Sequence, residues 1–122
     1  MREQGMQVVE FDEALKAFVE RRRKRRVQVH VPIVVKGLDF QGSRFEEATD
    51  SVNFSASGTC FFLNRRVKVA ATVVLLISLP PDLKTYKITG EVTRVEGDRG
   101  KPRYKYGIEF THGKRKTVNQ QG

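Results

Sequence analysis

The sequence predicts an all-β fold of six antiparallel strands, a small barrel or sandwich, preceded by a short helix. After residue 26, most of the chain alternates apolar and polar residues with a period of two, which is typical of half-buried strands. Turn-forming residues interrupt this alternation at short intervals, and no helical pattern separates the expected strands. Closure into a barrel would also remove exposed sheet edges, which a small sheet protein must otherwise protect.

The helix is expected at residues 8–20, ahead of the barrel. Apolar residues recur there at spacings of three and four, namely Val8, Phe11, Leu15 and Phe18. Such a stripe requires a partner surface, which is either the barrel or another molecule. Residues 1–7 carry no periodic signal, and we expect them to be disordered.

Six strands follow, each bounded by turn residues. We expect them at residues 27–38, 44–53, 58–63, 72–79, 86–95 and 103–111. Residues 39–43 form the first turn, and residues 96–100 form a hairpin loop. Pro80 and Pro81 end the fourth strand, because proline cannot donate a hydrogen bond to a ladder. Gly90 inside the fifth strand indicates a bend or a bulge.

The composition indicates one domain with an anionic partner. Within 122 residues, 23 Lys and Arg face 14 Asp and Glu, a net charge of +9 that favours nucleic acid, a nucleotide, a phosphorylated ligand or an acidic surface. No apolar run is long enough to span a membrane, and no signal peptide is apparent, so we expect a cytoplasmic protein. We divide the chain into an N-terminal extension (1–20), a barrel domain (21–112) and a flexible basic tail (113–122).

Catalytic and metal-binding patterns are poor. His30 and His112 have no partner at metal-ligand spacing, and Cys60 lies in an apolar strand as a small core residue would. Three close carboxylates on a polar strand are expected to be solvated: Glu46, Glu47 and Asp50. The chain has no phosphate-binding loop and no dinucleotide glycine fingerprint. We therefore expect a binding module rather than an enzyme, with no catalytic residue, no metal and no cofactor.

Two polar motifs remain, and each lies just ahead of a predicted strand. Residues 21–26 are six consecutive cations, which repel one another and alone indicate a solvated run or a nucleic-acid patch. Asn53, Ser55 and Gly58 lie where a turn is needed, and each residue type has an ordinary role in turns.

In this order, the two motifs resemble those of the PilZ family, the cyclic di-GMP receptor domains of bacteria. Arg22 and Arg26 match the family's Arg-x-x-x-Arg segment, and Arg21 matches the additional arginine that often precedes it. The family's Asp/Asn-x-Ser-x-x-Gly motif is matched by Asn53, Ser55 and Gly58. The resemblance covers roughly residues 21–112 and extends to a Gly-Ile-Glu-Phe sequence at 107–110. Thr59 stands where members often have a second glycine, and the residues after Phe110 lack the pattern of the C-terminal helix that many members carry.

The resemblance implies a PilZ-type barrel that binds cyclic di-GMP. It implies the ligand-binding residues Arg21, Arg22, Arg26, Asn53, Ser55 and Gly58. These residue types suit the ligand, because an arginine fork pairs with guanine O6 and N7 and can also stack on the base. An asparagine amide can pair with a base edge, and a glycine allows close approach of the backbone.

The register of the arginines is open from spacing alone. Arg21 and Arg25 have the same spacing as Arg22 and Arg26. We favour the second pair because Arg26 directly precedes the apolar strand, as the family's second arginine does.

We expect the ligand to order the arginine segment, to re-aim the helix and so to signal to an unidentified downstream protein. One alternative is a small basic barrel that binds RNA or single-stranded DNA, with Phe54, Phe61 or Phe62 as a stacking platform. Aromatic residues of apolar strands usually belong to the core, which makes nucleic acid the less favoured partner. Another alternative is an adaptor barrel that acts only through protein contacts.

Overall fold

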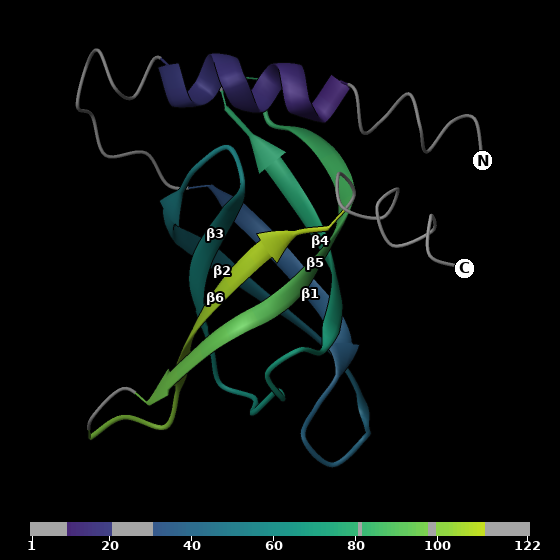
Figure 1. The fold of residues 1–122 in the computed structure, drawn as a ribbon, viewed down its shortest axis with the longest axis vertical. Helices are drawn as coiled ribbons and strands as arrows, with labels where there is room; N and C mark the ends of the chain where they lie inside the picture. The colour runs from purple at the N-terminus through teal and green to yellow at the C-terminus, as the bar shows by residue number, and fades with distance from the viewer. Residues whose placement is uncertain (1–9, 21–30, 81, 98–99, 112–122) are drawn as a thin grey trace, which may run out of the picture.

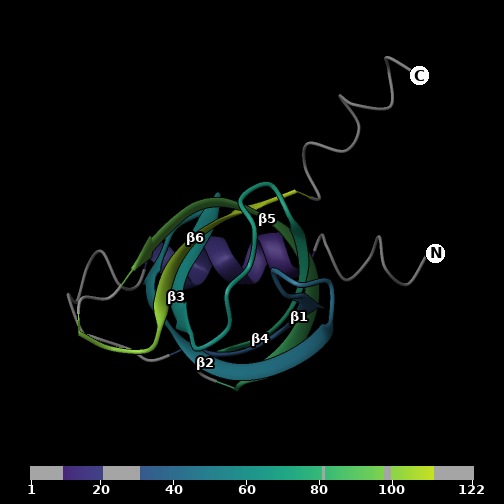
Figure 2. The same ribbon diagram turned by 90° about the horizontal axis from the view of Figure 1, so that it is seen from below.

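Six antiparallel strands close into a barrel in the computed structural model of the chain, which describes residues 10–20, 31–80, 82–97 and 100–111. The strands are β1 (Pro32–Leu38), β2 (Arg44–Phe54), β3 (Gly58–Leu63), β4 (Thr72–Leu79), β5 (Lys84–Gly97) and β6 (Tyr104–Phe110). Their order around the barrel is β1-β2-β3-β6-β5-β4, which Figures 1 and 2 show from the side and along the barrel. The predicted six-stranded antiparallel fold is therefore confirmed.

Most strand boundaries agree with the alternation in the sequence. The bounds of β3 and β4 are those predicted, and β4 ends at Leu79 just before the prolines. β5 is longer than predicted at both ends, because Lys84 and Thr85 already pair with β4, and Glu96 and Gly97 continue the ladder with β6 instead of belonging to the hairpin loop. β1 begins at Pro32, and the predicted strand residues 27–30 lie outside the described residues.

One helix, residues 10–20, closes one end of the barrel (Figure 1). Its apolar stripe is buried, with Phe11, Leu15 and Phe18 exposed by only 0%, 2% and 2%. The ring of Phe11 packs 5.5 Å from those of Tyr86 and Phe110, and the Phe18 ring lies 5.9 Å from that of Phe54. The barrel is therefore the partner surface that the stripe requires, and the helix completes the barrel core.

Of the bend or bulge predicted at Gly90, no bulge is present, because Gly90 pairs regularly with Val73 on one side and Phe110 on the other. A Cβ at this position would stand 2.5 Å from Cγ2 of Ile108, so the glycine leaves room for a neighbouring core side chain. The irregularities of the barrel lie elsewhere, between Ser51 and Asn53 on β2 and between Val92 and Arg94 on β5.

The one helix in the described part of the chain is too short and too polar to cross a membrane.

Candidate functional site

A bulge on β2 turns Asn53 to the outside of the barrel. Ser51 lies opposite Phe61 and faces the interior, and Asn53 lies opposite Cys60, so Val52 is the extra residue. A bulge shifts the phase of side-chain alternation by one residue. Asn53 is therefore exposed, and the next residue, Phe54, is buried in the core.

A second bulge, on β5, does the same for Arg94. Val92 lies opposite Ile108 and Arg94 lies opposite Gly107, which makes Thr93 the extra residue. The Thr93 hydroxyl donates a hydrogen bond to the Gly107 carbonyl at 3.2 Å and helps to hold the bulge. As a result, Asn53 and Arg94 both face outward, on the two strands that flank β3 and β6.

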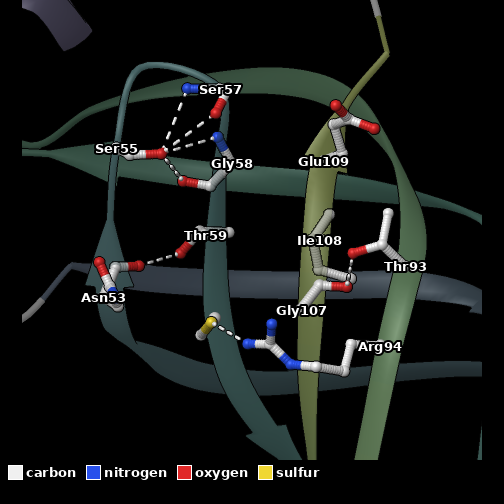
Figure 3. A pocket seen from close by; sticks show the side chains of 11 residues that line it. Asn53, Ser55, Ser57, Gly58, Thr59, Thr93, Arg94, Gly107, Ile108 and Glu109 are labelled. Carbon is white, nitrogen blue, oxygen red and sulfur yellow. Dashed lines mark hydrogen bonds between the residues drawn. The ribbon is translucent and has the colours of Figure 1, made fainter.

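Between these two side chains, the outer surface of β3 and β6 carries small residues. Cys60 pairs with Gly107 across the two strands, and Gly58 pairs with Glu109. The small side chains leave an open pocket of about 450 Å³, bordered by Asn53 on one side and Arg94 on the other (Figure 3). Its lining residues are Asn53, Ser55, Ser57, Gly58, Thr59, Cys60, Thr93, Arg94, Gly107, Ile108 and Glu109.

The β2–β3 turn forms one rim of the pocket, and Ser55 organises it. The Ser55 hydroxyl oxygen accepts hydrogen bonds from the backbone N–H groups of Ser57 and Gly58, at 3.3 and 3.2 Å. The Ser55 N–H donates to the Gly58 carbonyl at 2.9 Å, and the Thr59 hydroxyl donates to the Asn53 carbonyl at 2.7 Å. The ordinary turn roles of these residues are thus present, and the same turn presents Ser55 to the pocket.

Gly58 is required by the close approach of β6. A Cβ on Gly58 would stand only 2.1 Å from the Ile108 carbonyl oxygen, a backbone atom that cannot move aside cheaply. The same absence of a side chain exposes the backbone of β3 at the pocket floor.

Arg94 crosses the pocket floor. Its Nη2 atom lies 3.6 Å from Sγ of Cys60, and its Nε lies 3.5 Å from a carboxylate oxygen of Glu96. The side chain is 56% exposed, so its guanidinium is accessible at the pocket surface. Among the lining residues, the charged side chains are Arg94 and Glu109, so this part of the pocket supplies one cation.

Sequence reasoning missed Arg94, because it belongs to neither motif. A signal for it does exist: Val92 and Val95 are both apolar with two polar residues between them, which breaks strict alternation and indicates a bulge. Cys60 was predicted to be a small core residue, and this is wrong. It lies half-buried on the outer face of β3, because Thr59 and Phe61 occupy the inward positions.

The structure brings together Asn53, Ser55 and Gly58, whereas the predicted ligands Arg21, Arg22 and Arg26 lie outside the described residues. His30 and His112 also lie outside them. Within residues 10–20, 31–80, 82–97 and 100–111, no group of His, Cys, Asp and Glu is arranged to hold a metal ion.

The aromatic residues considered for base stacking do not form a platform. Phe54 and Phe61 are buried in the core, with exposures of 7% and 0%. Phe62 is half-buried, and the Arg103 guanidinium lies over its ring, 4.1 Å from the centroid.

The three carboxylates predicted to be solvated do not share one environment. Glu46 is exposed and pairs with Lys36 at 3.8 Å. Glu47 is half-buried and accepts a hydrogen bond from the Asn64 backbone N–H at 2.8 Å. Asp50 is exposed, as expected.

Comparison with known proteins gives two findings. The family profile of the PilZ domain matches residues 20–121 of this chain. The structure of the Bacillus subtilis inhibitor of motility (MotI/DgrA) is similar, with a TM-score of 0.54 and 19% sequence identity. The alignment covers 78% of this chain and 46% of that chain, so this chain spans about half of its length, and the likeness concerns the fold. A search of curated protein sequences finds no match.

Proposed function

Because the chain belongs to the PilZ family of cyclic di-GMP receptor domains, we propose that it binds cyclic di-GMP in the pocket between Asn53 and Arg94. The observation that carries this proposal is the meeting of Asn53, Ser55 and Gly58 at one open pocket on the outer face of the barrel. These three residues come from the motif that the family uses for this ligand.

Five of the lining residues have a chemical role in this proposal. The Asn53 amide offers both a donor and an acceptor to a base edge, and the Ser55 hydroxyl offers a further hydrogen bond. Gly58 and Gly107 keep the floor low enough for a flat purine to approach the backbone. Arg94 presents a guanidinium fork, which can grip a phosphate or the O6 and N7 atoms of guanine.

A doubly anionic ligand needs more than one cation, and we propose that residues 21–26, the six consecutive cations, supply the others. The Val31 carbonyl accepts a hydrogen bond from the Ser51 N–H at 3.0 Å, so the chain enters the barrel two residues from Asn53. Arg26 precedes Val31 by five residues. Because an extended chain advances about 3.3 Å per residue, its Cα can lie up to about 17 Å from that point. An arginine side chain adds further reach, so Arg22 and Arg26 are within range of the pocket.

In the proposed mechanism, the ligand orders the arginine segment and a partner protein detects the change. Residues 21–30 connect the helix to β1, so their ordering acts directly on the helix. Full release of the helix would expose Phe11, Leu15 and Phe18, at a cost of about 1.5–3 kcal/mol for each side chain. A shift of the packed helix is therefore the favoured signal, and it would alter amide exchange across residues 10–20.

The decisive experiment is a calorimetric titration of the full chain with cyclic di-GMP and, separately, with a single-stranded oligonucleotide at several salt concentrations. We expect binding of cyclic di-GMP that is lost in Arg22→Ala or Arg26→Ala and weakened in Asn53→Ala. Arg103→Ala is the matched control, because Arg103 is an arginine outside the pocket. Oligonucleotide binding that falls steeply with salt and survives Ser55→Ala, without binding of cyclic di-GMP, would favour the nucleic-acid barrel instead. If the chain binds neither cyclic di-GMP nor the oligonucleotide, the adaptor barrel that acts only through protein contacts is favoured.

A further inference from the structure

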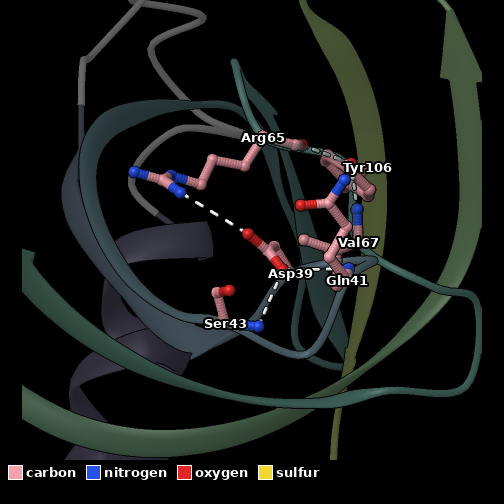
Figure 4. A network of polar contacts seen from close by, with 6 residues as sticks. All are labelled: Asp39, Gln41, Ser43, Arg65, Val67 and Tyr106. Atoms are coloured by element: carbon pink, nitrogen blue, oxygen red, sulfur yellow. Dashed lines mark hydrogen bonds and ion pairs between the residues drawn. The ribbon is translucent and has the colours of Figure 1, made fainter.

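Two loops are joined firmly at the end of the barrel opposite the helix. They are the β1–β2 turn, residues 39–43, and the first part of the β3–β4 connection, residues 64–69 (Figure 1). One carboxylate oxygen of Asp39 accepts the backbone N–H groups of Gln41 and Ser43, both at 2.9 Å. The other oxygen pairs with the Arg65 guanidinium at 3.5 Å, which links the two loops (Figure 4).

The barrel core anchors the second loop. The buried Tyr106 hydroxyl accepts a hydrogen bond from the Val67 N–H at 2.8 Å and donates one to the Arg65 carbonyl at 2.6 Å (Figure 4). The Phe40 N–H donates to the Arg66 carbonyl at 2.6 Å and connects the loops a second time. The backbone is therefore held without any help from the side chains of Phe40, Arg66 and Lys68.

These three side chains are exposed, together with two neighbouring amides. We name this surface the loop platform: Phe40, Gln41, Asn64, Arg66 and Lys68, flanked in the sequence by the exposed Leu38 and Val69. The Phe40 ring is 46% exposed. The Arg66 guanidinium lies 4.6 Å from its centroid, and Nζ of Lys68 lies 5.3 Å from it. Five large hydrophobic side chains are exposed among the described residues, and three of them belong to this platform or its flanks: Leu38, Phe40 and Val69.

The platform carries an excess of positive charge. Three cations, Arg65, Arg66 and Lys68, lie beside two carboxylates. Asp39 pairs with Arg65, and Glu47 accepts a hydrogen bond from the Asn64 backbone N–H. Within the described part of the chain, Arg66 and Lys68 have no ion pair and rest over the aromatic ring. A cation over an exposed aromatic ring gains only about 0.5–1 kcal/mol, so both charges remain available to an arriving carboxylate.

We propose that the loop platform binds an acidic segment of a partner protein, one in which glutamate or aspartate flanks a large apolar side chain. Arg66 and Lys68 pair with the acidic side chains, and Phe40 packs against the apolar one, with the exposed Leu38 and Val69 as further apolar surface. The Gln41 and Asn64 amides face solvent beside them and can pair with the backbone of the segment. Aromatic residues, phenylalanine among them, and arginine are enriched at the buried cores of protein interfaces.

A protein segment fits this surface better than a nucleic acid does. The ring that would stack a base already carries two cations. Leu38 and Val69 add exposed aliphatic surface, which has no counterpart on a phosphate backbone. Nucleic-acid binding also draws on many phosphate contacts, whereas this platform offers two unpaired cations.

The test uses the full chain and a labelled synthetic peptide in which a Leu-Phe pair is flanked by glutamates on both sides. We expect the peptide to bind, and expect its affinity to fall at least about tenfold in Phe40→Ala and in Arg66→Glu. Arg103→Glu is the matched control, because Arg103 also lies over a phenylalanine ring, that of the half-buried Phe62, and the charge change is the same. The control variant is expected to bind the peptide as the wild type does. A version of the peptide with glutamine in place of glutamate should bind weakly to every variant.

Three results would overturn the proposal. The first is no binding of the peptide to the wild type, and the second is equal binding by Arg66→Glu and the wild type. The third is preferential binding of an oligonucleotide or of phosphatidylserine vesicles at the platform, lost in Arg66→Glu. Thermal unfolding of each variant checks its fold, and none of these readouts depends on cyclic di-GMP.

Discussion

The guanidinium of Arg94 reaches from β5 across Gly107 to the thiol of Cys60, with 3.6 Å between Nη2 and Sγ. An added Cβ on Gly107 would lie 3.4 Å from that guanidinium, at van der Waals contact, so the arginine lies directly against the glycine. A bulge, a glycine and a cysteine from three strands thus combine to hold one cation flat on the pocket floor.

Replacing Arg94 by alanine is expected to weaken the binding of cyclic di-GMP by about tenfold or more, because a bidentate arginine contact contributes about 1–3 kcal/mol. Arg94→Lys should recover only part of this loss, since lysine lacks the planar fork. Calorimetry measures both affinities, with Arg103→Ala as the control. An affinity unchanged in Arg94→Ala would mean that the ligand does not contact the Arg94 side of the pocket.

Gly58→Ala is expected to lower the free energy of unfolding by about 3 kcal/mol or more, because the new methyl group would collide with the Ile108 carbonyl. The matched variant is Gly97→Ala, where a Cβ meets no atom within 4 Å, and its change should be within about 0.5 kcal/mol. Urea denaturation compares the two. Equal stabilities would mean that β3 and β6 can separate at this point at little cost.

Phe18→Ala is expected to cost about 3–5 kcal/mol of unfolding free energy, because its ring fills the helix end of the barrel core. Lys16→Ala changes the exposed side of the same helix and should stay within about 0.5 kcal/mol. Amide exchange of residues 10–20 should accelerate in the first variant. If both variants unfold alike, the helix contributes little to the core.

Tyr106→Phe is expected to destabilise the fold by about 1–3 kcal/mol, since the Arg65 carbonyl and the Val67 N–H both lose their partner. Tyr104→Phe on the same strand is the control and should change the stability less. Circular dichroism during thermal unfolding distinguishes the two variants.

Tyr106 also predicts how the stability of the fold depends on pH under alkaline conditions. Burial raises the pKa of Tyr106 above its usual 10.0, so the native state keeps the phenol proton at pH values where the unfolded chain releases it. The Tyr106 phenol therefore contributes fully to the stability of the fold below pH 10, and this contribution is lost as the pH rises through the raised pKa. Tyr106→Phe should therefore flatten the decline of stability above pH 10. An identical decline in both proteins would show that Tyr106 ionises as it would in the unfolded chain.

Local patterns in the chain were sufficient for the strands and for one half of the pocket, whereas the choice of a barrel over a sandwich depended on the resemblance to the PilZ family. Alternation and turn residues located β3 and β4 at their observed bounds, because each strand buries one face and prolines end β4. The helical stripe likewise predicted the burial of Phe11, Leu15 and Phe18. The residue types of the second motif predicted that Asn53, Ser55 and Gly58 lie together at one turn.

The other half of the pocket depends on how distant strands pair. Arg94 joins Asn53 only because two bulges shift the facing of β2 and β5, and the order of strands inserts β3 and β6 between them. Cys60 and the bulge considered at Gly90 were misjudged for the same reason. The neighbouring strand decides whether a side chain points inward or outward and how much room it has. That strand is many residues away in the sequence, so the local residue pattern does not contain this information.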